Sequence, residues 1–140
     1  MKTSACKHVP RGTDAAAIAA RRHLIVRFYA AWKAAHPRMQ CYNRNLNAYI
    51  NIRHVSVTET AMHASKSYLS TLAVLQLEVV LACAVKKATL LPKKNCKNQG
   101  HFDNIIIMEC NLPGIGRVKL TVGVLKATKE KVQYCITAIT

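Results

Sequence analysis

One predicted helix and one predicted strand carry side chains that could act on a phosphate ester. His63 and Lys66 lie three residues apart in the segment VSVTETAMHASKSYL, a spacing that places both on one face of a helix. Arg117 and Lys119 alternate with apolar residues, so they share one face of a strand. An imidazole exchanges protons near neutral pH, and cations stabilise negative charge that develops on phosphate. The pattern predicts phosphodiester chemistry, although a histidine without a chemical role fits the same spacing equally well.

The sequence carries little sign of other catalytic chemistries. Paired carboxylates for a glycosidase or a two-metal site are missing, because the acidic residues after position 58 lie far apart in the chain. The turn at 113–116 has two glycines but no Walker or dinucleotide-binding pattern around it. The six cysteines form no C-x-x-C pair and no zinc-finger spacing with histidine. We therefore expect neither a metal ion nor another cofactor.

The charge balance points to a polyanionic partner. The chain holds 21 Lys and Arg against 6 Asp and Glu, giving a formal net charge of +15 and a pI of about 10.0. Both halves are basic, since residues 1–58 contain Asp14 as their one acidic residue. Such a field concentrates polyanions, so nucleic acid or an anionic membrane surface is expected, with a basic surface that serves only solubility as the alternative.

Length, composition and cysteine usage suggest one cytoplasmic domain. With 140 residues of which 51% are hydrophobic, the chain can bury a substantial core. Unpaired cysteines favour a reducing compartment, and Cys83, Cys110 and Cys135 lie in apolar runs typical of core thiols. The N-terminus has no apolar stretch of signal-peptide type, and no segment is long and uncharged enough to cross a bilayer.

The first 36 residues predict a leader followed by a helix. Residues 1–13 are polar and basic, which favours a flexible leader, and Asp14 can cap a helix that runs to about Ala35. Apolar residues recur at helical spacing along it, namely Ile18, Ile25, Phe28 or Tyr29, and Trp32. The basic residues are expected largely off this stripe, namely Arg21, Arg22, Arg27 and Lys33. We interpret the helix as packed on its own domain; a helix lying on anionic lipid and an organelle transit peptide are alternatives.

The remaining residues, 42–140, complete a single α+β domain over 14–140. Cys41 to Asn47 is turn-like, and the residues from Ala48 to Arg53 alternate as in a short strand. Ser56 and Glu59 form a capping-box pattern. Helices are predicted at about 57–68 and 70–86, and strands at 88–91, 103–112, 117–127 and 132–139. N-terminal helices should then pack on one face of a roughly four-stranded antiparallel sheet.

Helices on the apolar side of this sheet would leave a basic side open. Arg117 and Lys119 would point to that open side, with Gln133 or Thr137 of the last strand beside them. An open basic sheet face suits a single-stranded polynucleotide, and an ordinary solvated face is an equally good interpretation. Further nucleic-acid contacts are expected from the following basic residues outside this face: Arg53, Lys93, Lys94 and Lys97.

The segment from Tyr42 to Ile139, about two-thirds of the chain, resembles a nuclease superfamily. The matching elements are the strand AYINI, the helix VSVTETAMHASKSYL, the helix LAVLQLEVVLACA, and the late strands RVKLTVGVLKA and VQYCITAI. Together they are similar to the phage and mobile-element branch of the barnase–EndoU–colicin–RelE (BECR) superfamily, of the type called large polyvalent protein-associated domains.

The resemblance implies a helix pair before a four-stranded antiparallel sheet and, in active members, metal-independent RNA cleavage. Residues carried over by position are His63 as acid or base, Lys66 as phosphate contact, Arg117 or Lys119 as strand cation, and Tyr134 or Thr137 as last-strand polar group. It further implies a toxin-like protein, RNA as partner and an inhibitor or immunity protein. No acidic partner of the helix histidine is evident from the sequence, so a non-catalytic nucleic-acid-binding or interaction module on the same scaffold is the alternative.

Overall fold

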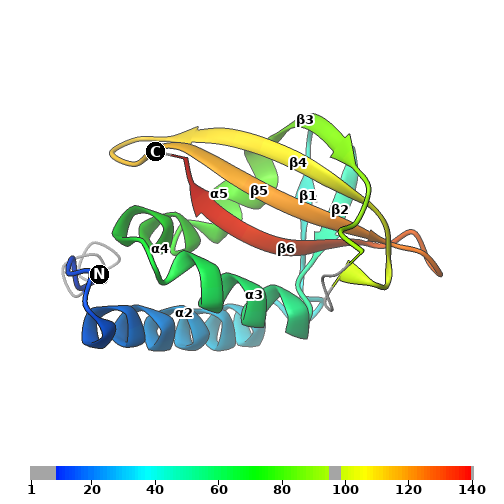
Figure 1. Cartoon of the computed structure of the whole chain (residues 1–140). Coiled ribbons are helices and arrows are strands. Elements are labelled where there is room, and N and C mark those ends of the chain that lie inside the picture. Colours follow the sequence, from blue (N-terminus) through cyan, green and yellow to red (C-terminus); the bar gives the residue numbers. More distant parts are fainter. Residues whose placement is uncertain (1–8, 95–98, 140) are drawn as a thin grey trace.

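The computed structural model describes residues 9–94 and 99–139, and these form helices packed against a curved sheet (Figure 1). The helices are α2 (Ala15–Ala35), α3 (His54–Ala64), α4 (Tyr68–Val74) and α5 (Leu77–Cys83). The strands are β1 (Gln40–Asn43), β2 (Ala48–Asn51), β3 (Val85–Leu90), β4 (Phe102–Leu112), β5 (Gly116–Leu125) and β6 (Lys131–Ala138). The predicted α+β class is confirmed.

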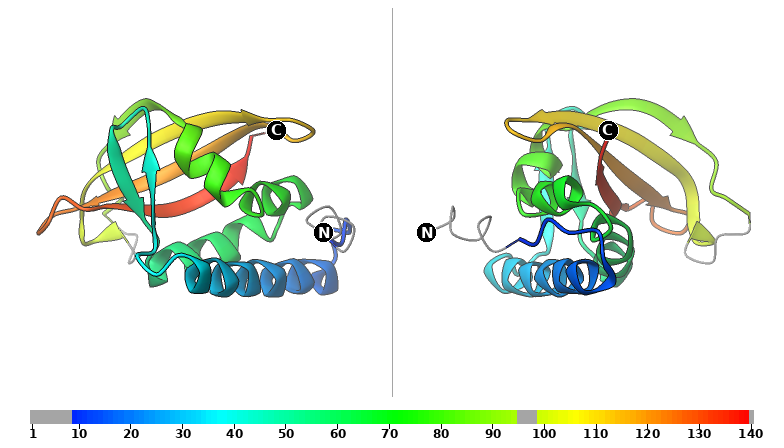
Figure 2. Two further views of the ribbon diagram at one scale, coloured as in Figure 1. Left: turned by 180° about the vertical axis from the view of Figure 1, so that it is seen from behind. Right: turned by 60° about the vertical axis from the view of Figure 1, so that its left-hand side comes forward.

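The described strands form one six-stranded sheet in the order β1-β2-β6-β5-β4-β3. Neighbouring strands are antiparallel except β2 and β6, which run parallel and meet at Asn51 and Val132. The β1–β2 hairpin crosses the long strands at a steep angle, and α4 and α5 lie within the resulting curl (Figure 2). The prediction of a roughly four-stranded antiparallel sheet is therefore wrong, because the sheet has six strands and is mixed.

The strand that the sequence analysis missed is β1, which includes the first three residues of the predicted turn at 41–47. Its asparagines suggested a loop, but Asn43 is completely buried. The Asn43 side-chain nitrogen donates to the carbonyls of Leu81 (2.8 Å) and Ala84 (3.0 Å), and its oxygen accepts from the Leu46 backbone N–H. A buried amide is tolerated when all of its groups are bonded, so Asn43 ties the hairpin to the end of α5.

The two faces of the long strands differ in composition. On the inner face, β5 and β6 bury apolar side chains against the helices, among them Val118, Leu120, Val122 and Ile136. On the outer face of the same strands the side chains are polar and only partly buried, among them Lys119, Thr121, Cys135 and Thr137. The predicted outward direction of Arg117, Lys119 and Thr137 agrees with this arrangement. Gln133 instead points inward and is fully buried.

Helix α2 packs on the domain through a stripe that includes an arginine. Ile25, Tyr29 and Trp32 are buried, which confirms packing on its own domain. Arg21 was expected off the stripe, but its side chain is completely buried. It donates to three carbonyl oxygens, those of Ser65 (2.7 Å), Pro10 (2.8 Å) and Gly12 (2.7 Å). Its long side chain reaches backbone oxygens that an apolar residue would leave unpaired.

Those contacts also bear on the predicted leader. Residues 1–8 lie outside the described part of the chain. Val9 is buried, and the carbonyls of Pro10 and Gly12 accept from Arg21, so residues 9–12 contact the domain, while the flexibility of the leader stays a prediction. The end of α3 at Ser65 is joined to the same guanidinium, where the negative end of the helix dipole favours a cation.

The later helices begin and end at other residues than predicted. Helix α3 starts at His54, and the Ser56 hydroxyl accepts from the Arg53 backbone N–H from within the first turn. The predicted long second helix is divided into α4 and α5 by a break at Leu75 and Gln76. The Ser67 hydroxyl caps α4 by accepting from the Ser70 N–H. The break lets two short helices follow the curl of the sheet.

Candidate active site

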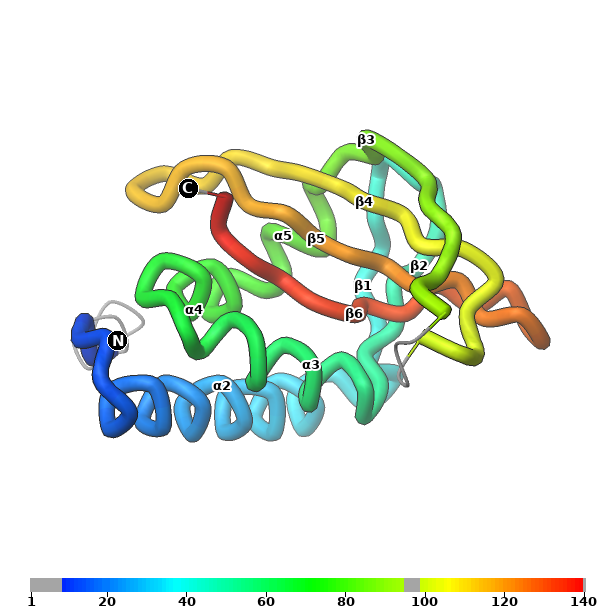
Figure 3. Tube along the Cα trace, in the orientation of Figure 1, coloured from blue at the N-terminus to red at the C-terminus, as the bar shows by residue number. Residues whose placement is uncertain are grey.

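Strand β2 pairs with β6 at one position only, so the rest of that edge of β6 has no neighbouring strand. Helix α3 lies along this open edge (Figure 3). The Thr60 hydroxyl donates to the Tyr134 carbonyl at 3.4 Å, and the Ser70 hydroxyl of α4 accepts from the Ala138 N–H at 2.8 Å. Helix hydroxyls thus bond strand groups that an adjacent strand would otherwise pair. This covered edge brings the predicted catalytic helix next to β6, and β5 with its predicted cations pairs with the opposite edge of β6.

One face of α3 follows the outer face of β6 residue by residue. Val55 packs with the apolar cluster of Phe102, Ile105, Val132 and Tyr134 at one end of the outer face. One helical turn later, the Glu59 carbonyl accepts from the Cys135 thiol at 3.9 Å. His63 follows after another turn on the same helix face. Because helix and strand run in the same direction here, His63 lies toward the Thr137 end of β6.

His63 has a carboxylate partner that the sequence analysis missed. Its Nε2 lies 3.3 Å from Oε1 of Glu59, one helical turn earlier. The Glu59 side chain is only 6% exposed, whereas that of His63 is 46% exposed. A mostly buried carboxylate thus touches an imidazole that solvent can reach. The signal was the i, i+4 spacing of Glu and His, which places two side chains side by side on any helix.

A row of polar residues crosses the outer face beside this pair. Thr137 of β6, Lys119 of β5 and Glu109 of β4 are neighbours in register. Arg117 lies two residues before Lys119, and its Nε is 3.3 Å from Oε1 of Glu109. The two predicted strand cations therefore lie on one face, and one of them is paired with a carboxylate while the other faces Thr137.

Cys135 of β6 is a thiol next to the candidate site, since it donates to the Glu59 carbonyl of α3. Burial raises the pKa of the Cys135 thiol to about 11; its backbone hydrogen bond with Ile136 lowers it, nearby Glu59 raises it and nearby Lys119 lowers it. The carboxylate of α3 and the ammonium of β5 therefore act on the thiol in opposite directions. At neutral pH the thiol is protonated and is a poor nucleophile. Among the predicted core thiols, Cys83 is exposed, and Cys110 and Cys135 are half-buried.

Two predicted catalytic residues are placed differently. The Tyr134 side chain is 6% exposed and packs edge-to-face on Phe102, with ring centroids 5.7 Å apart. Its ring belongs to the apolar cluster, which places it away from the polar row. Lys66 is exposed in the turn after α3, where its backbone N–H donates to the His63 carbonyl. The role of Lys66 as a phosphate contact stays a prediction. The role of Tyr134 as the last-strand polar group stays a prediction as well.

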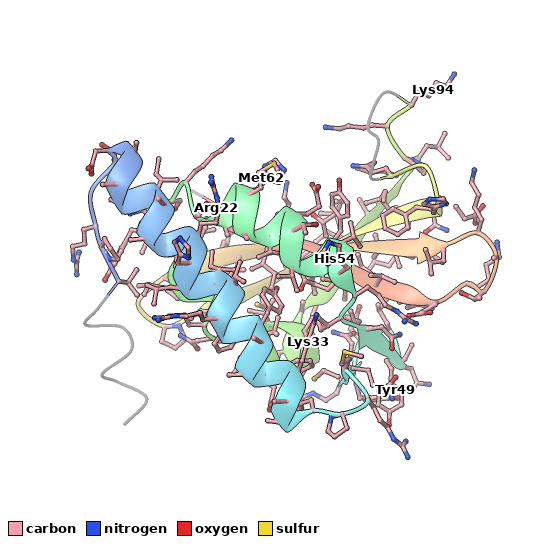
Figure 4. All side chains as sticks on the ribbon, turned by 90° about the horizontal axis from the view of Figure 1, so that it is seen from below. Arg22, Lys33, Tyr49, His54, Met62 and Lys94 are labelled. Carbon is pink, nitrogen blue, oxygen red and sulfur yellow. The ribbon has the colours of Figure 1, made fainter. Side chains whose placement is uncertain are left out.

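The four predicted nucleic-acid contacts differ in exposure and in whether they are already paired with a carboxylate. Lys93 and Lys94 are exposed in the loop after β3, and Lys94 extends from the far end of the molecule in Figure 4. Lys97 lies outside the described residues. Arg53 donates to both carboxylate oxygens of Glu130 at 2.8 Å, so its guanidinium joins the start of α3 to the β5–β6 turn. Its binding role stays a prediction.

The acidic residues are nearly all used within the molecule. Five of the six carboxylates in the sequence lie within 3.3 Å of a basic nitrogen: Glu59, Glu78, Asp103, Glu109 and Glu130. Two of the partners are histidines, and three are Arg53, Arg117 and Lys129. The excess of positive charge therefore remains on the surface, where it can attract an external polyanion.

Comparisons with protein-family models, with curated proteins and with solved structures found no match. The resemblance to the BECR superfamily therefore stays a prediction. Within residues 9–94 and 99–139, no three His, Cys, Asp or Glu side chains gather in a way that could hold a metal ion. No helix in the same described ranges is long and apolar enough to span a membrane.

Proposed function

We propose that the chain binds RNA and cleaves its backbone without a metal ion, with His63 as the group that transfers a proton. The observation that carries the proposal is the contact of solvent-accessible His63 with mostly buried Glu59, on the helix that borders the polar row of the outer face. A carboxylate beside an imidazole fixes the orientation of the ring, and cations nearby can hold a phosphate.

Backbone cleavage of RNA needs a base for the ribose 2′-OH and charge stabilisation on the phosphorus. In the proposed reaction, His63 takes the 2′-OH proton, the 2′-oxygen attacks phosphorus, and the 5′-oxygen of the next nucleotide leaves with a proton from water. Glu59 orients the imidazole that carries the transferred proton. Lys119 offsets negative charge on the non-bridging oxygens, and Thr137 beside it can donate a hydrogen bond to them.

The test is RNA cleavage in the presence of a metal chelator, with wild type compared with His63→Ala. We expect a loss of about 10²- to 10⁴-fold in the cleavage rate, the usual contribution of a general base. The matched control is His23→Ala, because His23 is an exposed histidine on α2. Equal rates for wild type and His63→Ala would refute the role of His63, and no cleavage by wild type would refute the catalytic proposal as a whole.

The second candidate is a nucleic-acid-binding module that does no chemistry. It is favoured by the surplus of surface cations over the five paired carboxylates. RNA binding that falls steeply with salt, without any cleavage, would support this function. The origin in a mobile element, a toxin role and an acidic inhibitor or immunity protein belong to the proposal as well. An acidic protein that suppresses cleavage would support that part.

A further inference from the structure

Two tyrosines form an exposed aromatic pair on the β1–β2 hairpin. Tyr42 and Tyr49 are opposite each other in register, with ring centroids 5.3 Å apart and ring planes at 75°. Tyr42 is 41% exposed and Tyr49 is 52% exposed, whereas large aromatic residues usually bury most of their surface. The Tyr42 hydroxyl donates to the Asn47 side-chain oxygen, which fixes the orientation of one ring. Figure 4 shows Tyr49 at the outer rim of the molecule, away from Arg22 and Met62.

We propose that this tyrosine pair is a stacking platform for the bases of a single-stranded nucleic acid. Every base has an aromatic face, so a fixed and exposed tyrosine ring offers favourable contact without sequence preference. The proposal rests on the proposed function for its choice of RNA, and it adds the substrate class: a strand with unpaired bases. A duplex hides the faces of its bases and cannot use the platform.

The charge around the platform is complementary to a phosphate backbone. No Asp or Glu occurs between residues 15 and 58, which include the whole hairpin. Exposed arginines lie at both ends of β1, Arg38 before it and Arg44 in the turn after it. The basic field draws in the backbone, and the rings then bind the bases.

The platform also continues into the outer face that holds the candidate active site. Asn51 lies two residues after Tyr49, so the two side chains share one face of β2. Asn51 pairs in register with Val132, and its side-chain nitrogen donates to the Lys131 carbonyl at 3.2 Å. Val132 belongs to the outer face of β6. A strand that stacks on the tyrosines can therefore follow the outer face toward Lys119 and His63.

The competing explanation is that the tyrosines only hold the hairpin together. Aromatic cross-strand pairs stabilise antiparallel strands, and β1 is one of the two edge strands of the described sheet. This explanation predicts that the rings contribute to folding and contribute nothing to affinity. The two explanations make opposite predictions for a substitution that keeps apolar packing but removes the aromatic face.

The experiment measures binding of fluorescently labelled RNA by anisotropy, in a His63→Ala background that prevents cleavage. The probe is a single-stranded RNA of roughly 12 nucleotides, within the range that such surfaces cover. Single-stranded DNA of the same sequence and the matching RNA duplex are measured in parallel. We expect Tyr49→Leu to weaken single-strand binding about 5- to 100-fold, to leave duplex binding unchanged and to keep the salt dependence.

Tyr49→Phe, which keeps the ring, should bind within about twofold of the parent protein. The control for loss of exposed apolar surface is Leu91→Ala, because Leu91 is 84% exposed in the loop after β3. Single-strand affinity that is equal for Tyr49→Leu and the parent protein would overturn the platform. An equal loss on single strand and duplex would overturn it too.

Tyr49→Trp keeps the test decisive if the leucine variant unfolds. It should bind single strands as tightly as the parent or more tightly, with quenching of its fluorescence on binding that the duplex does not cause. Unchanged fluorescence on binding would overturn the platform. The result is separable from the proposed cleavage: ring-dependent binding without any RNA cleavage by wild type supports the platform alone, and cleavage with ring-independent binding removes it.

Discussion

Two polar clusters on opposite faces of β6 differ in charge and in exposure to solvent. On the inner face, the Tyr29 hydroxyl donates to Gln133 (2.6 Å), and the Gln133 nitrogen donates to Thr60 (2.7 Å). All three side chains are completely buried and uncharged at neutral pH. On the outer face, Glu59 and His63 are ionisable and the imidazole reaches solvent.

The difference between the clusters lies in what is left for a ligand. The side chains of the inner cluster are hydrogen-bonded to one another and to the Tyr134 carbonyl, so the cluster joins α2, α3 and β6 and specifies their alignment. The outer cluster has charge and an accessible surface, which a substrate requires. We therefore expect inner variants to change stability, and outer variants to change RNA binding or cleavage.

The largest effect on stability is expected at Arg21, the cation that the inner packing encloses. Arg21→Ala leaves a cavity and removes the partner of three carbonyls, so the free energy of unfolding should fall by about 4 kcal/mol. The measurement is urea unfolding followed by circular dichroism. Arg22→Ala, one residue along the same helix and exposed, is the matched control and should stay within about 0.5 kcal/mol. A similar small change in both variants would contradict a structural role for the buried guanidinium.

The next largest effect is expected in the inner cluster itself. Gln133→Leu leaves the hydroxyls of Tyr29 and Thr60 without their amide partner, at a cost of about 2 kcal/mol in the free energy of unfolding. Thr137→Val on the outer face of the same strand should cost less, about 0.5 kcal/mol. Combining Gln133→Leu with Tyr29→Phe should recover part of the loss, because one orphaned hydroxyl is then removed. Purely additive losses would show that the cluster does not act as a unit.

The Cys135 thiol on the outer face of β6 should make stability depend on alkaline pH. Burial raises the pKa of the Cys135 thiol from its ordinary value of 9.0 to about 11, so the folded state holds the thiol proton more tightly than the unfolded state. The stabilisation is complete below pH 9 and is lost as the pH rises to about 11, a decrease of about 3 kcal/mol. Unfolding of Cys135→Ala should lack this part of the pH dependence. Cys83→Ala, which removes an exposed thiol, should keep it.

The smallest effect on stability is expected for the outer cluster. His63→Gln and Lys119→Gln should change the free energy of unfolding by no more than about 0.5 kcal/mol, since both side chains are partly solvated. The same variants should lower cleavage and RNA affinity. Thermal unfolding and anisotropy on the same samples provide both measurements. A large loss of stability in either variant would mean that the outer cluster also serves the fold.

The long elements were predictable because their patterns are local. The helix at 15–35 and the strands at 102–112, 116–125 and 131–138 lie within about two residues of the predicted bounds. Their apolar residues repeat with the periods of a helix or a strand over many residues. The alternation around Lys119 likewise predicted which side chains point outward. The contact of Glu59 with His63 was also available from the spacing of the two residues.

The errors came from residues whose environment the local pattern does not determine. Arg21 and Asn43 are polar types that usually lie at the surface, and both are buried where backbone carbonyls surround them. The register between β5 and β6 shifts between Thr121, which pairs with Cys135, and Val122, which pairs with Gln133. The alternation of side chains along β6 is therefore interrupted between Gln133 and Cys135. A bulge reverses which side chains point outward. The sequence does not show the bulge, so simple alternation placed Gln133 on the outer face, whereas it points inward.

The sequence by itself determined the basic charge, the α+β class, the long helices and strands, and the alternation that places cations on one side of β5. Only the tertiary structure decided the six-strand order, the parallel contact of β2 with β6 and the position of α3 along the open edge of β6. The physical reason is that periodicity records which side of an element is buried, whereas partners far apart in the chain are chosen by packing. His63 and Lys119 are 56 positions apart in the chain, and β6 brings their elements together because α3 packs on one of its edges and β5 pairs with the other.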